Sequence, residues 1–279
     1  MSMPAVGSPL WIVGQVRRYL ASGDYDGFFA GWPGHSVVDI ATHGTQRLRA
    51  ALVEATLHEA RGFERRVPVP EPMEPWLRNK LGPMVQGLFT VQERDRVLDA
   101  LVAGIVFLTP HNIVDVLTTE PWLSTAWRLA NLYLDSLGAR RLSSQSDELV
   151  GLSQDTTCYV SLAYFDQTDP FADYVVHEAA HVLHNCRRTT IGLPERRRCA
   201  TPLDIAFRKR ETFAYACEAY SRILAMAQGR EARQAALERH TASGLPPDER
   251  VDHGQYLAIL SEAVRARNGW QCIRKRCAP

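Results

Sequence analysis

The chain has 279 residues, of which 46% are hydrophobic and 23% charged, a composition typical of a globular protein with a sizeable core. Its formal net charge is only +1, so no overall field attracts nucleic acid or an anionic membrane surface. We therefore expect no nucleic-acid partner. The N-terminal residues lack the basic start, apolar core and cleavage site of a secretory signal, and the expected location is the cytoplasm.

The first half of the chain carries apolar residues at helical spacing. Proline, glycine and asparagine separate the helical stretches from one another. The most apolar window, residues 98–108, has about half of the roughly 20 residues that a membrane-spanning helix needs, so no membrane span is expected. We predict a helical N-terminal region over residues 1–142, with helices at 10–21, 45–63, 75–89, 91–108, 111–118 and 123–137.

The composition changes at about residue 143. Two short runs, ELVGLS (148–153) and TCYVSLAYF (157–165), are rich in residues that suit a strand, which predicts a small sheet or hairpin. A helix over 174–185 follows, with either Asp169 or Asp173 as its N-cap. Further helices are predicted at about 203–228, 230–241 and 246–267. The expected fold class is α+β, mainly α, with a second region over residues 143–279.

The motif His177-Glu178-Ala179-Ala180-His181 lies within the predicted helix 174–185. Two histidines four residues apart rise about 6 Å along one face of a helix, so both rings can reach one metal ion. The adjacent glutamate can reach a water molecule on that ion. Apolar neighbours on both sides indicate burial, which would be unfavourable for these polar groups without a metal. We therefore predict a site for one Zn²⁺ ion with His177 and His181 as ligands.

A third ligand is expected downstream, because catalytic zinc takes three protein ligands and keeps one position open for water. The predicted helix RKRETFAYACEAYSRIL (208–224) offers Glu211 and Glu218. The strand TCYVSLAYF precedes the motif, and an exposed edge there could bind an extended substrate through backbone hydrogen bonds.

The combination of HEAAH with a later helix reading ETFAYACEAY resembles the gluzincin group of zinc metallopeptidases over roughly residues 150–225. The resemblance implies a zincin-like catalytic region. It also implies Glu211 as the third ligand, through the matching Phe213 and Ala214. Glu218 would then support a ligand, or would itself be the ligand if the register differs. A metzincin is disfavoured, because His184 and Arg187 stand where that group has a glycine and a third histidine.

The function predicted from these residues is a zinc-dependent hydrolase, a metallopeptidase acting on a peptide or protein. Glu178 is the expected general base. Tyr215 is the expected group that stabilises negative charge on the carbonyl oxygen, with His240, His253 and Tyr256 as alternatives.

Several other interpretations remain open. The metal could serve a regulatory or interaction module without turnover, or a hydrolase of a non-peptide amide or ester. An effector delivered into another cell would carry the same residues. The histidines could also be ordinary core residues that are satisfied by carboxylates.

Overall fold

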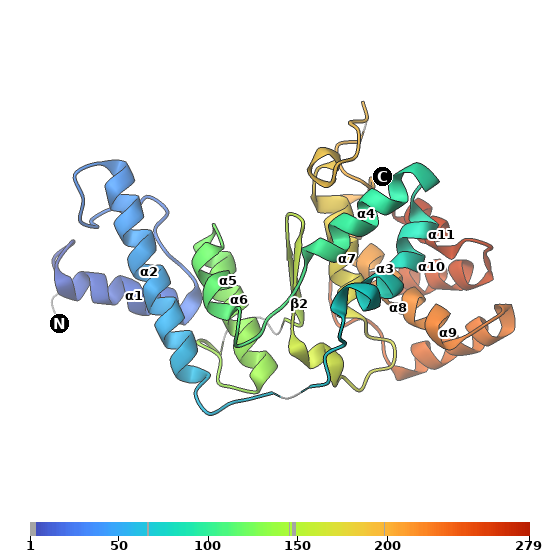
Figure 1. The fold of residues 1–279 in the computed structure, drawn as a ribbon, viewed down its shortest axis with the longest axis horizontal. Coiled ribbons are helices and arrows are strands. Elements are labelled where there is room, and N and C mark those ends of the chain that lie inside the picture. The colour runs from blue at the N-terminus through green and yellow to red at the C-terminus, as the bar shows by residue number, and fades with distance from the viewer. Residues whose placement is uncertain (1–3, 66, 145, 147–148, 198) are drawn as a thin grey trace. The chain divides into compact units, whose positions relative to one another are not determined.

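The computed structural model describes residues 4–65, 67–144, 146, 149–197 and 199–279. These residues form a mostly helical chain with one three-stranded sheet, which confirms the α+β, mainly α fold class (Figure 1). Within the described ranges, no helix is long and apolar enough to cross a membrane. All six cysteines are described, and none forms a disulfide.

The chain divides into two compact units that alternate along the sequence. Unit 1 comprises Met1–Arg66, Leu108–Val150 and Ser161–Ala163, and unit 2 comprises Val67–Phe107, Gly151–Val160 and Tyr164–Pro279. This division differs from the predicted boundary between residues 142 and 143. Residues 67–107 belong to unit 2 because their two helices pack against helices and a strand of the C-terminal half.

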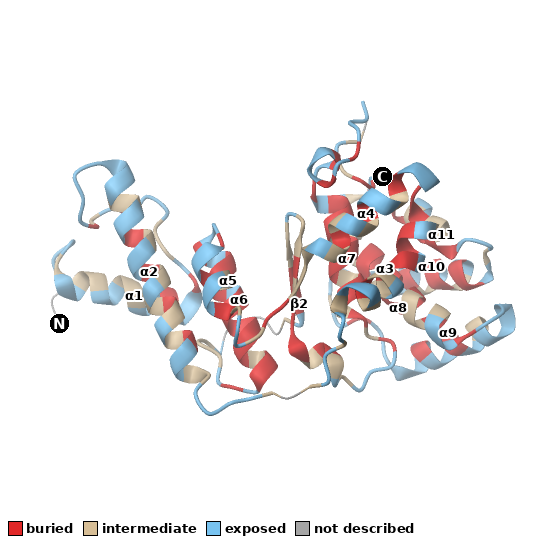
Figure 2. Cartoon of the chain, in the orientation of Figure 1, coloured by how far each residue is buried: buried red, intermediate tan, exposed pale blue. Residues whose placement is uncertain are grey.

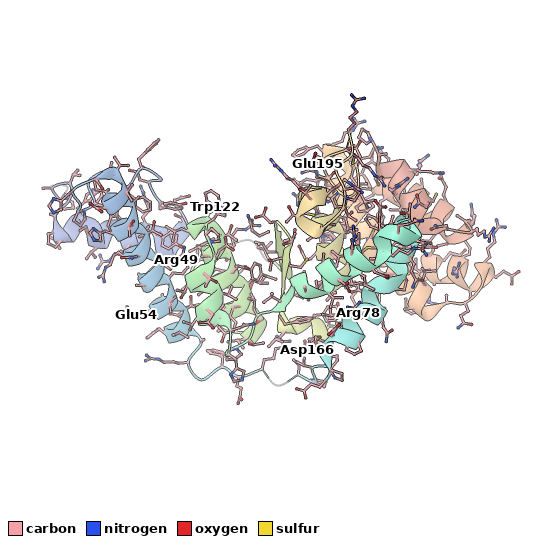
Figure 3. All side chains as sticks on the ribbon, turned by 45° about the horizontal axis from the view of Figure 1, so that its top comes forward. Arg49, Glu54, Arg78, Trp122, Asp166 and Glu195 are labelled. Atoms are coloured by element: carbon pink, nitrogen blue, oxygen red, sulfur yellow. The ribbon has the colours of Figure 1, made fainter. Side chains whose placement is uncertain are left out.

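The described part of unit 1 has four α-helices, α1 (Pro9–Ser22), α2 (Val37–Glu59), α5 (Ile113–Thr119) and α6 (Leu123–Leu137). α6 is buried along most of its length (Figure 2). Polar groups in the core of unit 1 donate to backbone carbonyls. The Tyr19 hydroxyl donates to Leu123 O at 2.7 Å, and Trp127 Nε1 donates to Leu20 O at 2.9 Å. Trp122, before α6, is 58% exposed (Figure 3).

Unit 2 contains seven α-helices among its described residues. They are α3 (Met73–Leu88), α4 (Val91–Gly104), α7 (Tyr174–Asn185), α8 (Arg210–Met226), α9 (Arg230–Ser243), α10 (His253–Arg265) and α11 (Gly269–Cys277). α7 packs against α8 on one side and against two strands of the sheet on another. It is therefore enclosed by structure, and its buried residues include Val176 and Leu183.

The sheet has the order β1-β3-β2, with β1 (Ile105–Phe107), β2 (Gly151–Gln154) and β3 (Thr157–Val160). β1 runs parallel to β3 with Val106 opposite Tyr159, and β2 runs antiparallel to β3 with Leu152 opposite Tyr159. β3 is thus the central strand, so the expectation that its own edge is free for a substrate was wrong. Among the described strands, β1 and β2 are the outer strands of the sheet.

Several element boundaries differ from those predicted. The helix predicted over 91–108 ends at Gly104, and residues 105–107 form β1 instead. A Cβ at Gly104 would lie 2.1 Å from Thr156 O, so the close approach to the β2–β3 turn requires glycine there. α2 begins eight residues earlier than predicted, at Val37, because Ser36 caps it.

The later part of the chain shows further differences from the predicted boundaries. The predicted strand 157–165 ends at Val160 and continues as the 3-10 helix Leu162–Phe165, and Glu148 of the other predicted strand lies outside the described residues. The helix predicted at 203–228 begins at Arg210. The helix predicted at 246–267 begins at His253, where Asp252 is the N-cap. α11 was not predicted.

Candidate metal centre

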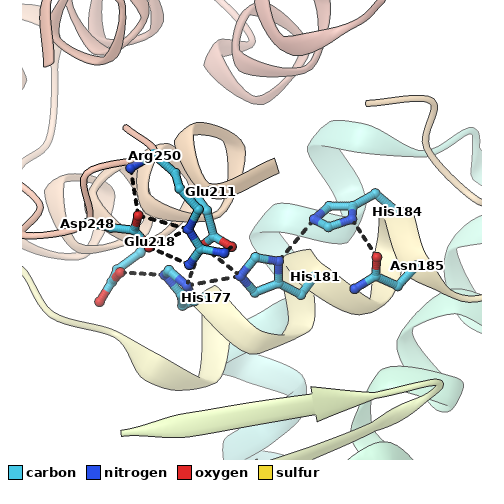
Figure 4. A network of polar contacts seen from close by, with 8 residues as sticks. All are labelled: His177, His181, His184, Asn185, Glu211, Glu218, Asp248 and Arg250. Atoms are coloured by element: carbon cyan, nitrogen blue, oxygen red, sulfur yellow. Dashed lines mark hydrogen bonds and ion pairs between the residues drawn. The ribbon is translucent and has the colours of Figure 1, made fainter. Parts of the chain in front are cut away.

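α7 begins at a buried aspartate. Asp173 is fully buried, and its side chain accepts a hydrogen bond from Val176 N, which makes it the N-cap. Asp169, the other candidate, instead accepts from Phe171 N before the helix starts. With the helix start fixed in this way, His177 and His181 lie one turn apart on the side of α7 that faces α8 (Figure 4).

The side chains of His177, His181 and Glu211 meet at one point (Figure 4). The two Nε2 atoms are 3.1 Å apart, and Glu211 Oε2 lies 3.3 Å from His181 Nε2 and 3.9 Å from His177 Nε2. Ligand atoms on a tetrahedral zinc with bonds of about 2.0–2.2 Å are roughly 3.3–3.5 Å from one another. These donors therefore fit a divalent ion, and their side chains are 13–17% exposed.

Each of these three side chains has a partner for its second polar atom. His177 Nδ1 contacts Glu218 Oε2 at 2.9 Å, and His181 Nδ1 contacts His184 Nε2 at 3.1 Å. Glu211 Oε1 contacts Arg250 Nη1 at 3.0 Å. Outer partners of this kind fix the ring orientation and the tautomer of metal-binding histidines. Here they leave both Nε2 atoms and Glu211 Oε2 directed toward the common point.

Glu218 supports the site from α8 but is not one of the converging donors. Its Oε2 contacts His177 Nδ1, and its Oε1 accepts a hydrogen bond from Asp173 N at 2.6 Å. Of the two glutamates offered by the sequence, the structure brings Glu211 to the histidine Nε2 atoms. Burial lowers the pKa of His177, but Glu218 and the other nearby carboxylates outweigh it and raise this pKa to about 9.

The sequence analysis did not identify a second layer of charged residues around α7. Lys80 from α3 contacts Asp173 Oδ2 at 2.8 Å, and the Tyr164 hydroxyl donates to Asp173 Oδ1 at 3.2 Å. Burial raises the pKa of Asp173, and the charge of Lys80 opposes that effect. Lys80 and Arg250 lie far from the HEAAH motif in sequence, so no local pattern could have indicated either residue.

Glu178 lies next to the start of β2. It is 7% exposed, and a Cβ added to Gly151 would lie 2.6 Å from Glu178 Cγ and 2.8 Å from its Oε1. The carboxyl group therefore lies directly against the backbone of β2. Burial raises the pKa of Glu178, while the neighbouring His177 and His181 lower it, and the net shift is upward. A carboxyl group in this state is suited to accept and then release a proton.

Among the four candidates for charge stabilisation, Tyr215 is the one that contacts a proposed ligand. Its ring centroid lies 4.5 Å from that of His177. His240 Nε2 instead contacts the Tyr256 hydroxyl at 2.6 Å, and both residues are buried. His253 Nε2 contacts Pro246 O at 2.9 Å. The last three side chains thus have partners away from the converging donors.

The site combines three donors that fit a divalent ion, the buried carboxyl group of Glu178 on the helix that carries both histidines, and the nearby phenol ring of Tyr215. A scan against protein-family models found no matching family, and searches of curated proteins and of solved structures found no match. The chemical capacity of the site follows from its own residues: they can bind a metal ion and hold a proton at Glu178, and the Tyr215 ring packs against His177.

Proposed function

We propose that this protein is a zinc-dependent hydrolase, a metallopeptidase with a zincin-like catalytic region similar to that of gluzincins. The observation that carries the proposal is the convergence of His177 Nε2, His181 Nε2 and Glu211 Oε2 at 3.1–3.9 Å from one another. Two imidazoles and one carboxylate are a typical ligand set of catalytic zinc, which keeps its fourth position open. A purely structural zinc site fills all four positions and has no use for Glu178.

A bound zinc ion would polarise the scissile carbonyl group and acidify a water molecule. Glu178 acts as the general base: it accepts the proton of the attacking water and then donates it to the leaving amine. Its upward-shifted pKa supports this role, because the carboxyl group must hold the proton between the two steps. The Tyr215 hydroxyl stabilises the negative charge that develops on the carbonyl oxygen.

The sheet supports a peptide as the substrate. β2 pairs only with β3 among the described strands, so its other edge is free of strand partners. Its first residue, Gly151, lies against Glu178. An extended peptide that pairs with this edge through backbone hydrogen bonds would run past the general base. An ester or a non-peptide amide would make no use of this edge.

The proposal is tested by metal content together with turnover. We expect about one zinc ion per chain in the wild type, loss of zinc in His181→Ala and Glu211→Gln, and retained zinc without turnover in Glu178→Gln. Zinc is measured by mass spectrometry of the purified proteins, and turnover with a library of quenched fluorescent peptides. A wild type that takes up no zinc, or a Glu178→Gln variant that remains fully active, would contradict the proposal.

A further inference from the structure

Arg250 lies in the connection between α9 and α10, next to the proposed metal ligands. Its Nη1 atom is 3.0 Å from Glu211 Oε1, while the other oxygen of the same carboxylate faces His181 Nε2 at 3.3 Å. The Arg250 side chain is 66% exposed. Figure 4 shows its guanidinium group beside Glu211.

The connection holds this guanidinium group in a fixed position. Arg250 Nε and Nη2 donate to the Asp248 carboxylate at 2.9 and 2.5 Å, and Arg250 N donates to Asp248 Oδ1 at 2.8 Å. The contact between His253 Nε2 and Pro246 O closes the loop, and Asp252 caps the helix that follows. The side-chain hydrogen bonds to Asp248 raise the pKa of Arg250, so the group is charged at any physiological pH.

An inventory of donors shows that Arg250 has unused binding capacity. A guanidinium group carries five N–H donors. Asp248 accepts from Nε and Nη2, and Glu211 accepts from Nη1, which leaves one N–H on each of the two Nη atoms. Arg188 provides the contrast: it is 1% exposed and is held by two backbone carbonyls and Glu93. Arg188 therefore stabilises the fold, whereas Arg250 is held by Asp248 and Glu211 and remains open to solvent.

We propose that Arg250 binds a carboxylate of the substrate next to the scissile bond, so that the protein selects peptides with an anionic group at that position. This inference rests on the proposed function, because it needs a metal ion at His177, His181 and Glu211. Planar guanidinium groups with two free N–H donors bind carboxylates with good geometry. The carboxylate is either an acidic side chain or the C-terminus of the peptide.

The test measures binding to the zinc-loaded full-length protein without any turnover. Three probes each carry a succinyl hydroxamate, which binds the metal, joined to aspartic acid amide, to asparagine as the free acid, or to asparagine amide. The first probe offers a side-chain carboxylate, the second a terminal carboxylate and the third none. We expect one acidic probe to bind the wild type at least about tenfold more tightly than the neutral probe, as measured by calorimetry.

Arg250→Met, once loaded with zinc, should lose this preference, while Arg250→Lys should keep part of the preference. Arg239→Met, which alters an exposed arginine on α9, should behave as the wild type. Equal binding of all three probes to the wild type overturns the inference alone. An undiminished preference in zinc-loaded Arg250→Met also overturns it. Failure of the zinc-loaded wild type to bind any probe overturns the proposed function as well.

Discussion

The two units bury different kinds of polar groups. Among its described residues, unit 1 buries one acid, Glu120, and otherwise neutral groups such as Tyr19, Asn131 and Ser136, which bind backbone carbonyls. The residues described for unit 2 include seven buried acids and bases: Glu93, Asp173, Glu178, His184, Arg188, Glu218 and His240.

The kind of buried polar group distinguishes a unit whose core serves stability from a unit whose core could serve chemistry. Neutral groups that are satisfied by the backbone stabilise a core, whereas a buried charge is unfavourable unless another charge or a ligand compensates it. Four of the buried groups of unit 2, Asp173, Glu178, His184 and Glu218, belong to the network around the proposed metal ligands. Clusters of shifted pKa values are common at functional sites, which supports our proposal that unit 2 carries the chemistry.

The largest effect on stability is expected for Glu93→Gln, which leaves Arg188 buried without its counter-charge. Removing one partner of a buried ion pair lowers the free energy of unfolding by about 3–5 kcal/mol. Burial raises the pKa of Glu93, but Arg188, Thr90 and Arg196 outweigh it and lower this pKa below its ordinary value of 4.5.

The stabilisation by Glu93 is therefore present above pH 4.5 and is lost as the pH falls through the lower folded-state pKa. Urea unfolding of wild type and variant across pH measures both effects. A difference that stayed constant down to the lowest pH would contradict the role of the charge.

Gly151→Ala tests the contact between β2 and the general base. The new methyl group would overlap Glu178 Cγ, which lies 2.6 Å from the ideal Cβ position, and would displace the carboxyl group. A displacement of about 1 Å can lower turnover by about a hundredfold, and we expect zinc content to be unchanged. Gly82→Ala in α3 is the matched control, because its Cβ meets no atom within 4 Å. Equal turnover in the two variants would refute the contact.

Glu218→Gln tests the support of His177. The amide cannot replace the carboxylate as an acceptor for both Asp173 N and His177 Nδ1 with equal strength. Loss of such a partner lowers metal affinity by about 10–100-fold. Competition with a zinc chelator measures this change, and Glu231→Gln on the exposed face of α9 should leave affinity unchanged. Wild-type affinity in Glu218→Gln would mean that His177 needs no such support.

The smallest effect is expected in unit 1. Tyr19→Phe removes the hydroxyl group that donates to Leu123 O and leaves that carbonyl without this donor, which lowers the free energy of unfolding by about 1 kcal/mol. Zinc content and turnover should be unchanged, because the substitution touches no group of the metal centre. Thermal unfolding and metal content check both statements, and Tyr25→Phe, which removes a less buried hydroxyl, is the control. A loss of zinc in Tyr19→Phe would contradict the statement that the metal centre depends on unit 2 alone.

The sequence was most informative where one element carries the whole signal. The HEAAH motif predicted a helix that places both histidines on one face, because helical spacing alone determines this relation. The mainly helical fold class also followed from periodicity. β1 could not be predicted, since its three residues become a strand only by pairing with β3, about fifty residues later in the chain.

Tertiary packing decides the rest of the site. Lys80 and Arg250 come from a helix and a loop on either side of the motif in sequence, and only packing brings them to Asp173 and Glu211. The choice of Asp173 over Asp169 as the N-cap depends on tertiary neighbours too, because Lys80 and the Tyr164 hydroxyl compensate the fully buried carboxylate of Asp173.

The alternation of the two units along the chain also bears on how the protein is made. α3 is synthesised early, yet its partners include α11, whose Gln271 donates to Gly87 O and Leu88 O at 2.9 and 3.0 Å. The part of α3 that packs against α11 therefore stays uncovered until α11 has been synthesised. Such an interval favours aggregation of nascent chains and makes chaperone supply a determinant of yield when the protein is expressed.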